Sequence, residues 1–183
     1  DIVGISIITT NFFGALHAAK LAKQILPSVT IVCGGTHMMI FPNETLSYKE
    51  FDYGFIGEAE IPFAKFVSTF KMPDFAPQQI DGLVWRENVK TVINSQYGFN
   101  ENLNELPFPA YHLLDLGKYK MPNMKGNVVS LYLSRGCPFN CGFCYRNPLL
   151  KKVRFKSVDR VIREIVFMKN NYGIKEINFV DET

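Results

Sequence analysis

Two kinds of hydrophobic periodicity alternate along the first 70 residues, and this alternation limits the possible fold more than any other feature. Apolar, β-branched runs of strand length take turns with stretches that have apolar residues at helical spacing. The strand-like runs are residues 2–10, 29–33 and 53–56, and the helical stretches are residues 14–26, a short segment starting near Pro42, and residues 61–70. Apolar strands joined by helices are typical of a parallel sheet flanked by helices. We therefore predict an α/β fold for residues 1–75.

The alternation ends at a proline-rich segment, residues 72–77. Two short β-type runs, residues 83–86 and 91–93, then flank a polar turn and predict an antiparallel hairpin. Residues 98–127 show neither period and contain prolines and many aromatic residues, so we expect an ordered linker there. Residues 76–127 are therefore predicted to be a hairpin followed by a linker.

A second α/β segment begins at residue 128. Residues 128–134 and 175–180 are strand-like, and residues 157–172 between them carry apolar residues on one helical face. We therefore predict a third unit, a strand, a helix and a strand, over residues 128–183.

The composition excludes several classes of protein. Apolar residues make up 47% of the 183 residues and charged residues 20%, which suits a packed core and argues against disorder. No apolar run reaches the roughly 18 residues of a membrane-spanning helix. The net charge of +3 is too small to indicate a nucleic-acid or membrane partner.

Three of the four cysteines form a tight cluster with the spacing C-x3-C-x2-C, namely Cys137, Cys141 and Cys144. An odd-numbered cluster with short spacings disfavours a disulfide framework and favours a metal site in a reducing compartment, so a cytoplasmic location is expected. Thiolates are the soft ligands that iron–sulfur clusters need. Three of them leave one metal position open for an added ligand.

Other chemistry fits the same cysteines. Zinc could take a fourth ligand from Cys33 or His112, and the group could also be redox-active thiols. Neither Cys33 nor His112 has a spacing paired with the cluster, and the odd number of thiolates favours iron–sulfur over zinc.

The segment from Arg135 to Tyr145 resembles the signature of the radical S-adenosylmethionine (SAM) enzymes, in which C-x3-C-x2-C follows the first strand of a (β/α) barrel. The resemblance implies that the three cysteines ligate three irons of a [4Fe-4S] cluster and that SAM chelates the fourth. It also implies that an electron from a donor such as flavodoxin or ferredoxin cleaves SAM to a 5'-deoxyadenosyl radical. Residues 128–183 would then be the first βαβ unit of the barrel.

The same resemblance implies roles for two further residues. Phe143 occupies the aromatic position before the last cysteine and would lie near the adenine of SAM. Asp181 ends the last strand-like run, where polar groups of this family help to hold the SAM amino group. Ordinary packing for Phe143, and a helix cap or turn for Asp181, are the alternatives.

Residues 1 to about 70 resemble the later part of the Rossmann-like cobalamin-binding domain that precedes many radical SAM domains. The matching positions, all at the carboxyl ends of predicted strands, are Ser6, Thr9, Gly34, Gly35 and Glu58. The resemblance implies that these residues contact cobalamin, with Ser6 and Thr9 near its nucleotide tail. The usual D-x-H-x-x-G motif is absent, and His37 is interpreted as a hydrogen-bonding residue beside the glycine turn.

We therefore expect a radical SAM iron–sulfur enzyme that is cobalamin-dependent and acts as a methyltransferase, on a small-molecule substrate that the sequence does not identify. A (β/α) barrel takes about 250 residues, so we expect the chain to be a fragment that is inactive alone.

Two alternatives remain. One is a radical SAM enzyme that does not use cobalamin. The other is a Rossmann-like binding module with a zinc loop that contacts RNA through the basic residues around the cysteines, which are Arg135, Arg146, Lys151, Lys152, Arg154 and Lys156. The balanced overall charge favours a solvated face for these residues, and nucleic acid is not the expected partner.

Overall fold

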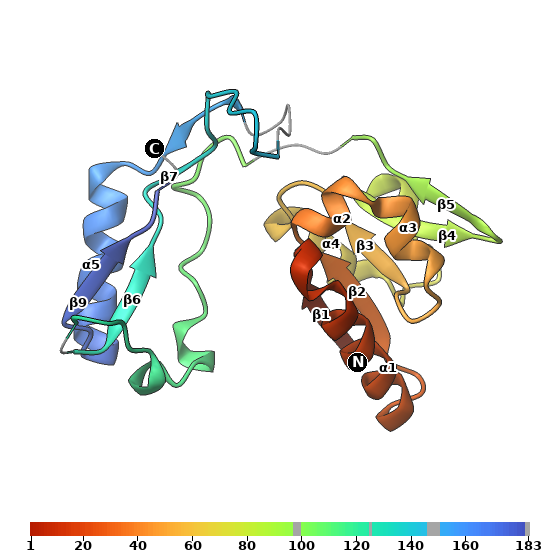
Figure 1. Cartoon of the computed structure of the whole chain (residues 1–183), viewed down its shortest axis with the longest axis horizontal. Helices are drawn as coiled ribbons and strands as arrows, with labels where there is room; N and C mark the ends of the chain where they lie inside the picture. The colour runs from red at the N-terminus through yellow and green to blue at the C-terminus, as the bar shows by residue number, and fades with distance from the viewer. Residues whose placement is uncertain (97–99, 125, 146–150, 182–183) are drawn as a thin grey trace. The chain divides into compact units, whose positions relative to one another are not determined.

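The structure is a computed structural model that describes residues 1–96, 100–124, 126–145 and 151–181. The chain divides into two compact units, Asp1–Phe99 and Asn100–Thr183 (Figure 1). Each unit has its own hydrophobic core. Among the described residues, none of the helices has the length and hydrophobicity needed to span a bilayer.

The first unit is built on one five-stranded sheet with the order β1-β2-β3-β4-β5 (Figure 1). The first three strands pair in parallel, and the last two continue the sheet in antiparallel fashion. The strands are β1 (Ile2–Ser6), β2 (Thr30–Gly34), β3 (Tyr53–Phe55), β4 (Leu83–Glu87) and β5 (Lys90–Ile93).

Helices cover both faces of this sheet because β2 is apolar on both sides. Ile31 and Cys33 lie in one core with residues of α1 (Phe12–Ile25), α2 (Thr36–Ile40) and α3 (Pro42–Ser47). Val32 points the other way and lies in a second core with residues of α4 (Glu60–Thr69). Such double coverage explains why the strands read as continuous apolar runs and not as alternating ones.

The hairpin of β4 and β5 belongs to the first sheet. Val84 pairs with Gly54 of β3, and Val84 is fully buried. The guanidinium of Arg86 donates to the carbonyl oxygens of Leu46 and Tyr48, at 2.7 and 3.3 Å, which ties the hairpin to the end of α3. The first compact unit therefore extends past the boundary expected at residue 75, because the hairpin supplies hydrogen-bond partners for β3.

The second unit is a strand–helix–strand crossover. β6 (Val128–Leu131) and β9 (Glu176–Phe179) pair in parallel, and α5 (Val158–Tyr172) packs against them. Ser157 caps the start of α5 by accepting a hydrogen bond from the backbone N–H of Arg160, and Gly173 ends it with a left-handed φ of 62°.

Two short 3₁₀ turns, η3 (Tyr111–Leu113) and η4 (Leu116–Lys118), lie on the segment that precedes β6. The predictions of an α/β fold and of a βαβ order are confirmed. Among the described residues, β6 and β9 form a two-stranded sheet that is not closed into a barrel.

Candidate cofactor sites

The cysteine loop starts and ends at one small antiparallel ladder. β7 (Ser134–Arg135) leads into the loop and β8 (Arg154–Phe155) leaves it, with Ser134 opposite Phe155. The strand β7 continues from the carboxyl end of β6, which is the end at which active sites of barrel enzymes lie. Local pairing of β7 with β8 therefore places the loop where the sequence predicts it.

The three clustered cysteines are accessible on this loop. Cys137 is half-buried, whereas Cys141 and Cys144 are exposed, and the chain turns between the last two through a 3.2 Å hydrogen bond from the backbone N–H of Cys144 to the carbonyl of Cys141. All four cysteines lie in the described residues, and none forms a disulfide. In the described part of the chain, no three metal-ligating side chains converge on one point. The donor set, three thiols on one loop, nevertheless fits an iron–sulfur cluster.

The fourth cysteine has a different environment. Cys33 is 1% exposed in the core of the first unit, and its thiol contacts the carbonyl oxygen of Tyr53 at 3.4 Å. Burial raises the pKa of the Cys33 thiol to about 12. A metal ligand must be a thiolate, so this environment disfavours Cys33 as a zinc ligand.

Polar contacts hold the segment that leaves the loop. The guanidinium of Arg154, which is 5% exposed, donates to the carbonyl of Asn100 at 2.9 Å. The backbone N–H of Ser157 donates to the side chain of Asn104 at 2.8 Å, and Lys152 forms an ion pair with Glu101. The exit of the loop is thus fixed to the start of the second unit.

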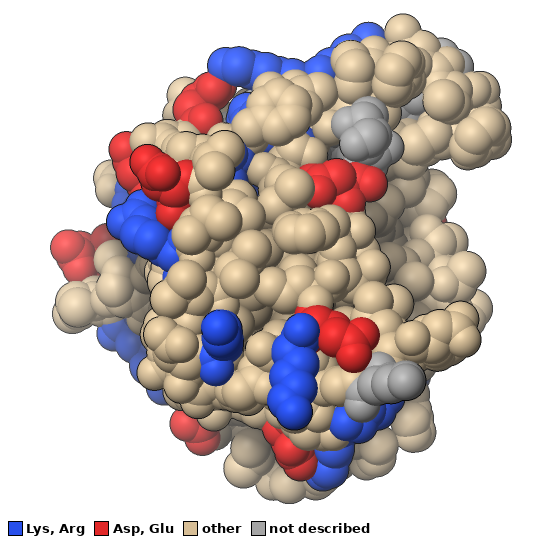
Figure 2. Space-filling view, turned by 90° about the vertical axis from the view of Figure 1, so that its left-hand side faces the viewer, with Lys and Arg blue, Asp and Glu red and all other residues tan. Residues whose placement is uncertain are grey.

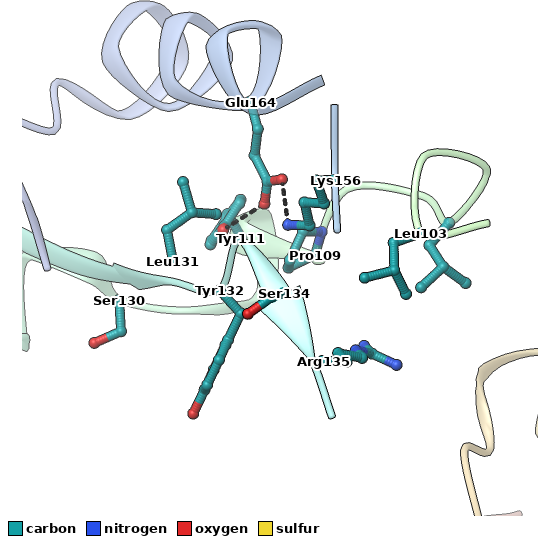
Figure 3. Close-up of a pocket in the computed structure, with 11 residues that line it drawn as sticks. Leu103, Pro109, Tyr111, Ser130, Leu131, Tyr132, Ser134, Arg135, Lys156 and Glu164 are labelled. Carbon is teal, nitrogen blue, oxygen red and sulfur yellow. Dashed lines mark hydrogen bonds and ion pairs between the residues drawn. The ribbon is translucent and has the colours of Figure 1, made fainter. Parts of the chain in front are cut away.

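A buried carboxylate lines a pocket that β7 also borders (Figure 3). Glu164 projects from α5 and is fully buried; the ammonium of Lys156 donates to it at 2.8 Å and the hydroxyl of Tyr111 at 3.2 Å. These three residues help to line a cavity of about 120 Å³ that Ser134 and Arg135 also border. Burial, followed by the charge of Glu164, raises the pKa of the Tyr111 hydroxyl above its ordinary value.

The positions matched to cobalamin binding lie at one edge of the first sheet. Ser6 ends β1 and pairs with Gly34, which ends β2, while Thr9 begins the turn η1 (Thr9–Asn11). Glu58 follows β3, the next parallel strand. Ligands of open α/β sheets bind beyond the carboxyl ends of such strands. The structure therefore brings these segments to the edge at which a ligand is expected.

Gly35 and His37 connect two of these segments. A Cβ on Gly35, whose φ is 92°, would lie 2.6 Å from the carbonyl oxygen of Ile7, so only glycine fits this approach. His37 is 4% exposed, and its Nδ1 lies 3.2 Å from the Thr9 hydroxyl. Its Nε2 is buried and has no hydrogen-bond partner in the described residues. A tight glycine turn and an unsatisfied buried nitrogen fit a cofactor-binding edge.

The two residues assigned to SAM differ in their surroundings. Phe143 is 95% exposed and lies close to the thiols in the chain. Asp181 is partly buried, and its Oδ1 accepts hydrogen bonds from Leu133 and Ser134.

Two of the described basic residues in the cysteine region are paired with carboxylates. On the face in Figure 2, Lys and Arg are interspersed with Asp and Glu. Lys152 pairs with Glu101, and Lys156 pairs with buried Glu164. Arg146 lies outside the described residues. This mixture of signs gives little support to an RNA-binding role.

Fold and loop together define a class of protein: a helix-covered parallel sheet with a ligand-binding edge, followed by a βαβ unit that carries a thiolate loop. Comparison with protein families assigns a cofactor-related family to each of these two parts. Residues 1–67 match the B12 binding domain, and residues 131–183 match the Radical SAM superfamily. The predicted resemblance to radical SAM enzymes with a cobalamin-binding domain is thereby confirmed.

Known relatives match the whole chain. An uncharacterized methyltransferase of Pyrococcus horikoshii is 38% identical over 100% of this chain and 40% of its own length. Cytidylyl-2-hydroxyethylphosphonate methyltransferase of Streptomyces wedmorensis is 29% identical, again over 100% and 40%. The chain thus spans about 40% of the length of these relatives.

A solved structure has the same fold. The radical SAM methyltransferase TsrM of Kitasatospora setae, with tryptophan and a SAM analogue bound, aligns with a TM-score of 0.69. The alignment covers 99% of this chain and 36% of that one at 15% sequence identity.

Proposed function

We propose that this chain provides the cobalamin-binding and cluster-binding parts of a radical SAM methyltransferase. The observation that carries the proposal is the loop with three accessible thiols at the carboxyl end of β6, in a chain whose first sheet ends in a glycine-rich edge. The two family matches, in this order along the chain, support it. Methyl transfer is preferred as the reaction because both reported relatives are methyltransferases.

In this proposal Cys137, Cys141 and Cys144 hold the cluster. When bound, a [4Fe-4S] cluster with three thiolate ligands supplies an open coordination position for SAM and the electron for its reductive cleavage. The protein contributes orientation: the β7–β8 ladder and the contacts of Arg154 hold both ends of the loop. Phe143, exposed beside the thiols, is available to cover the adenine of SAM and exclude water from it.

The edge of the first sheet holds cobalamin in the same proposal. When bound, cobalamin supplies a carrier for the methyl group. The hydroxyls of Ser6 and Thr9 bind polar groups of its tail, and the backbone at Gly34 and Gly35 permits close approach. Glu58, which follows β3, contacts cobalamin at the same edge of the sheet.

The proposal requires further partners. A reductant such as flavodoxin or ferredoxin must deliver the electron, and a small molecule must accept the methyl group. A cytoplasmic location, with its reducing conditions, stays a prediction.

Iron uptake tests the cluster assignment. After anaerobic reconstitution of the full-length protein, we expect about four irons and four sulfides per chain. Replacing Cys137, Cys141 or Cys144 by alanine, one at a time, should abolish the stable cluster. Cys33→Ala is the matched control and should retain it, because Cys33 is buried in the first unit. Uptake of zinc alone, or equal iron in all four variants, would overturn the assignment.

A further inference from the structure

Besides the β7–β8 ladder, one carboxylate oxygen contacts the entrance of the cysteine loop. Oδ1 of Asp181 accepts hydrogen bonds from the backbone N–H of Leu133 at 3.0 Å and from the backbone N–H of Ser134 at 2.6 Å. It also accepts one from the Ser134 hydroxyl at 2.6 Å. Asp181 lies just beyond β9, so these contacts join the end of β9 to the strand that leads into the loop.

The anchored residues lie very close to the first thiol. Only Arg135 and Gly136 separate Ser134 from Cys137. Gly136 has a φ of 95°, so the chain turns sharply directly after β7. Hydrogen bonds to a carboxylate are among the stronger polar contacts, so Asp181 restrains this segment together with the pairing of β7 with β8. Cys137 directly follows the turn at Gly136.

The same contacts leave Oδ1 little capacity for a further ligand. A carboxylate oxygen has about two lone-pair sites, and three donors already converge on this one. Oδ1 is therefore committed to the protein chain, whereas Oδ2 is a separate acceptor.

We propose that Asp181 is a positioning residue: through Oδ1 it holds β7, and through β7 it holds Cys137 in place for the cluster. This inference rests on the proposed function. In this role the Asp181 side chain connects the end of β9 to the cysteine loop. Groups that orient metal ligands without touching the metal commonly change metal affinity by about 10-fold to 100-fold when removed.

The test compares iron retention with SAM binding in the full-length, reconstituted protein. Asp181→Ala should release iron to a chelator at least about tenfold faster than the unsubstituted protein. Asp181→Asn should release it at nearly the original rate, because the amide oxygen can accept the same hydrogen bonds. The affinity for SAM of the fraction that keeps its cluster is measured separately, by the change of its electron paramagnetic resonance spectrum, so that loss of the cluster and loss of SAM binding are told apart.

Asp115→Asn is the control, because Asp115 is 62% exposed and lies in the same unit. Normal iron retention together with lost SAM binding in Asp181→Ala would overturn the inference. If Asp181→Ala does not fold, Ser134→Ala carries the test: it removes one of the three donors and should speed iron release by a smaller factor. Unchanged release in Ser134→Ala would then count against the inference.

A second readout separates this inference from the proposed function. Hydrogen exchange of the Leu133 and Ser134 amides should speed up in Asp181→Ala even without metal, because both amides lose their acceptor. Absence of iron from the unsubstituted protein would refute the proposed function, whereas unchanged exchange at these two amides would refute the anchor.

Discussion

At the scale of single residues, the second unit depends on a carboxylate that helical periodicity does not single out. Glu164 lies three residues after Val161 and four before Met168, so it shares the inward face of α5. A pattern analysis treats such a charged residue as exposed, yet Glu164 is fully buried between Lys156 and Tyr111. The only sequence signal for the burial of Glu164 is its helical spacing from the apolar residues Val161 and Met168. The three cysteines needed no such inference, because their spacing alone identifies them.

Removing the Glu164 charge should destabilise the second unit. Glu164→Gln leaves the Lys156 ammonium without its partner in a site where that side chain is 15% exposed. Breaking a buried ion pair in this way costs about 3 kcal/mol. Urea unfolding measures the loss, and Asp115→Asn, at an exposed ion pair, should cost less than about 1 kcal/mol. Equal effects of the two substitutions would contradict the burial of Glu164.

Tyr111 should make stability fall at high pH. Its pKa in the folded chain is raised by burial and by Glu164, whereas in the unfolded chain the pKa is about 10. The stabilisation from the protonated hydroxyl is therefore complete below about pH 10 and is lost as the pH rises toward the folded-state pKa.

Tyr111→Phe tests this dependence. The variant should be about 1 kcal/mol less stable near neutral pH, because Glu164 loses a donor, and its stability should fall less steeply than that of the original chain above about pH 10. Urea unfolding at several pH values checks both. Parallel pH profiles of the two proteins would show that Tyr111 does not titrate as described.

At the scale of secondary-structure elements, local patterns predict the strands and helices but not every pairing. The alternation in residues 1–70 is enough for β1 to β3 and for α1, α3 and α4, since continuous apolar strands have few other arrangements. The short helix α2 was not predicted, and β1 ends at Ser6, earlier than the strand expected over residues 2–10. The hairpin of β4 and β5 was recognised from its turn, but its pairing with β3 depends on long-range contacts such as that of Arg86 with the end of α3. No local signal encodes that contact.

The turn after β2 should be intolerant of side chains. Gly35→Ala places a Cβ against the Ile7 carbonyl at a positive φ, and should cost about 2 kcal/mol. Gly4→Ala, on the adjacent strand, meets no atom within 4 Å and should be nearly neutral.

Cobalamin binding gives a second readout of the same pair of variants. In the full-length protein, titration with hydroxocobalamin should show weaker binding for Gly35→Ala than for Gly4→Ala. Equal affinities of the two variants for hydroxocobalamin would show that the glycine turn is not part of the cobalamin site.

At the scale of the whole molecule, two units carry two cofactor functions in one chain. The first matches a B12 binding domain and the second a Radical SAM domain, and the chain spans about 40% of its relatives. The sequence could show both through the cysteine spacing and the glycine turn. The contacts that hold the loop, such as those of Asp181, bring together residues 47 and 48 positions apart, and only the fold reveals them.

The presence of both cofactors in one chain is tested by metal counting on the full-length protein, reconstituted anaerobically with iron, sulfide and hydroxocobalamin and freed of unbound cofactor. We expect about four irons and about one cobalt in the same chain, with iron lost and cobalt retained in Cys141→Ala. Zinc in place of iron, with no bound cobalt, would contradict it.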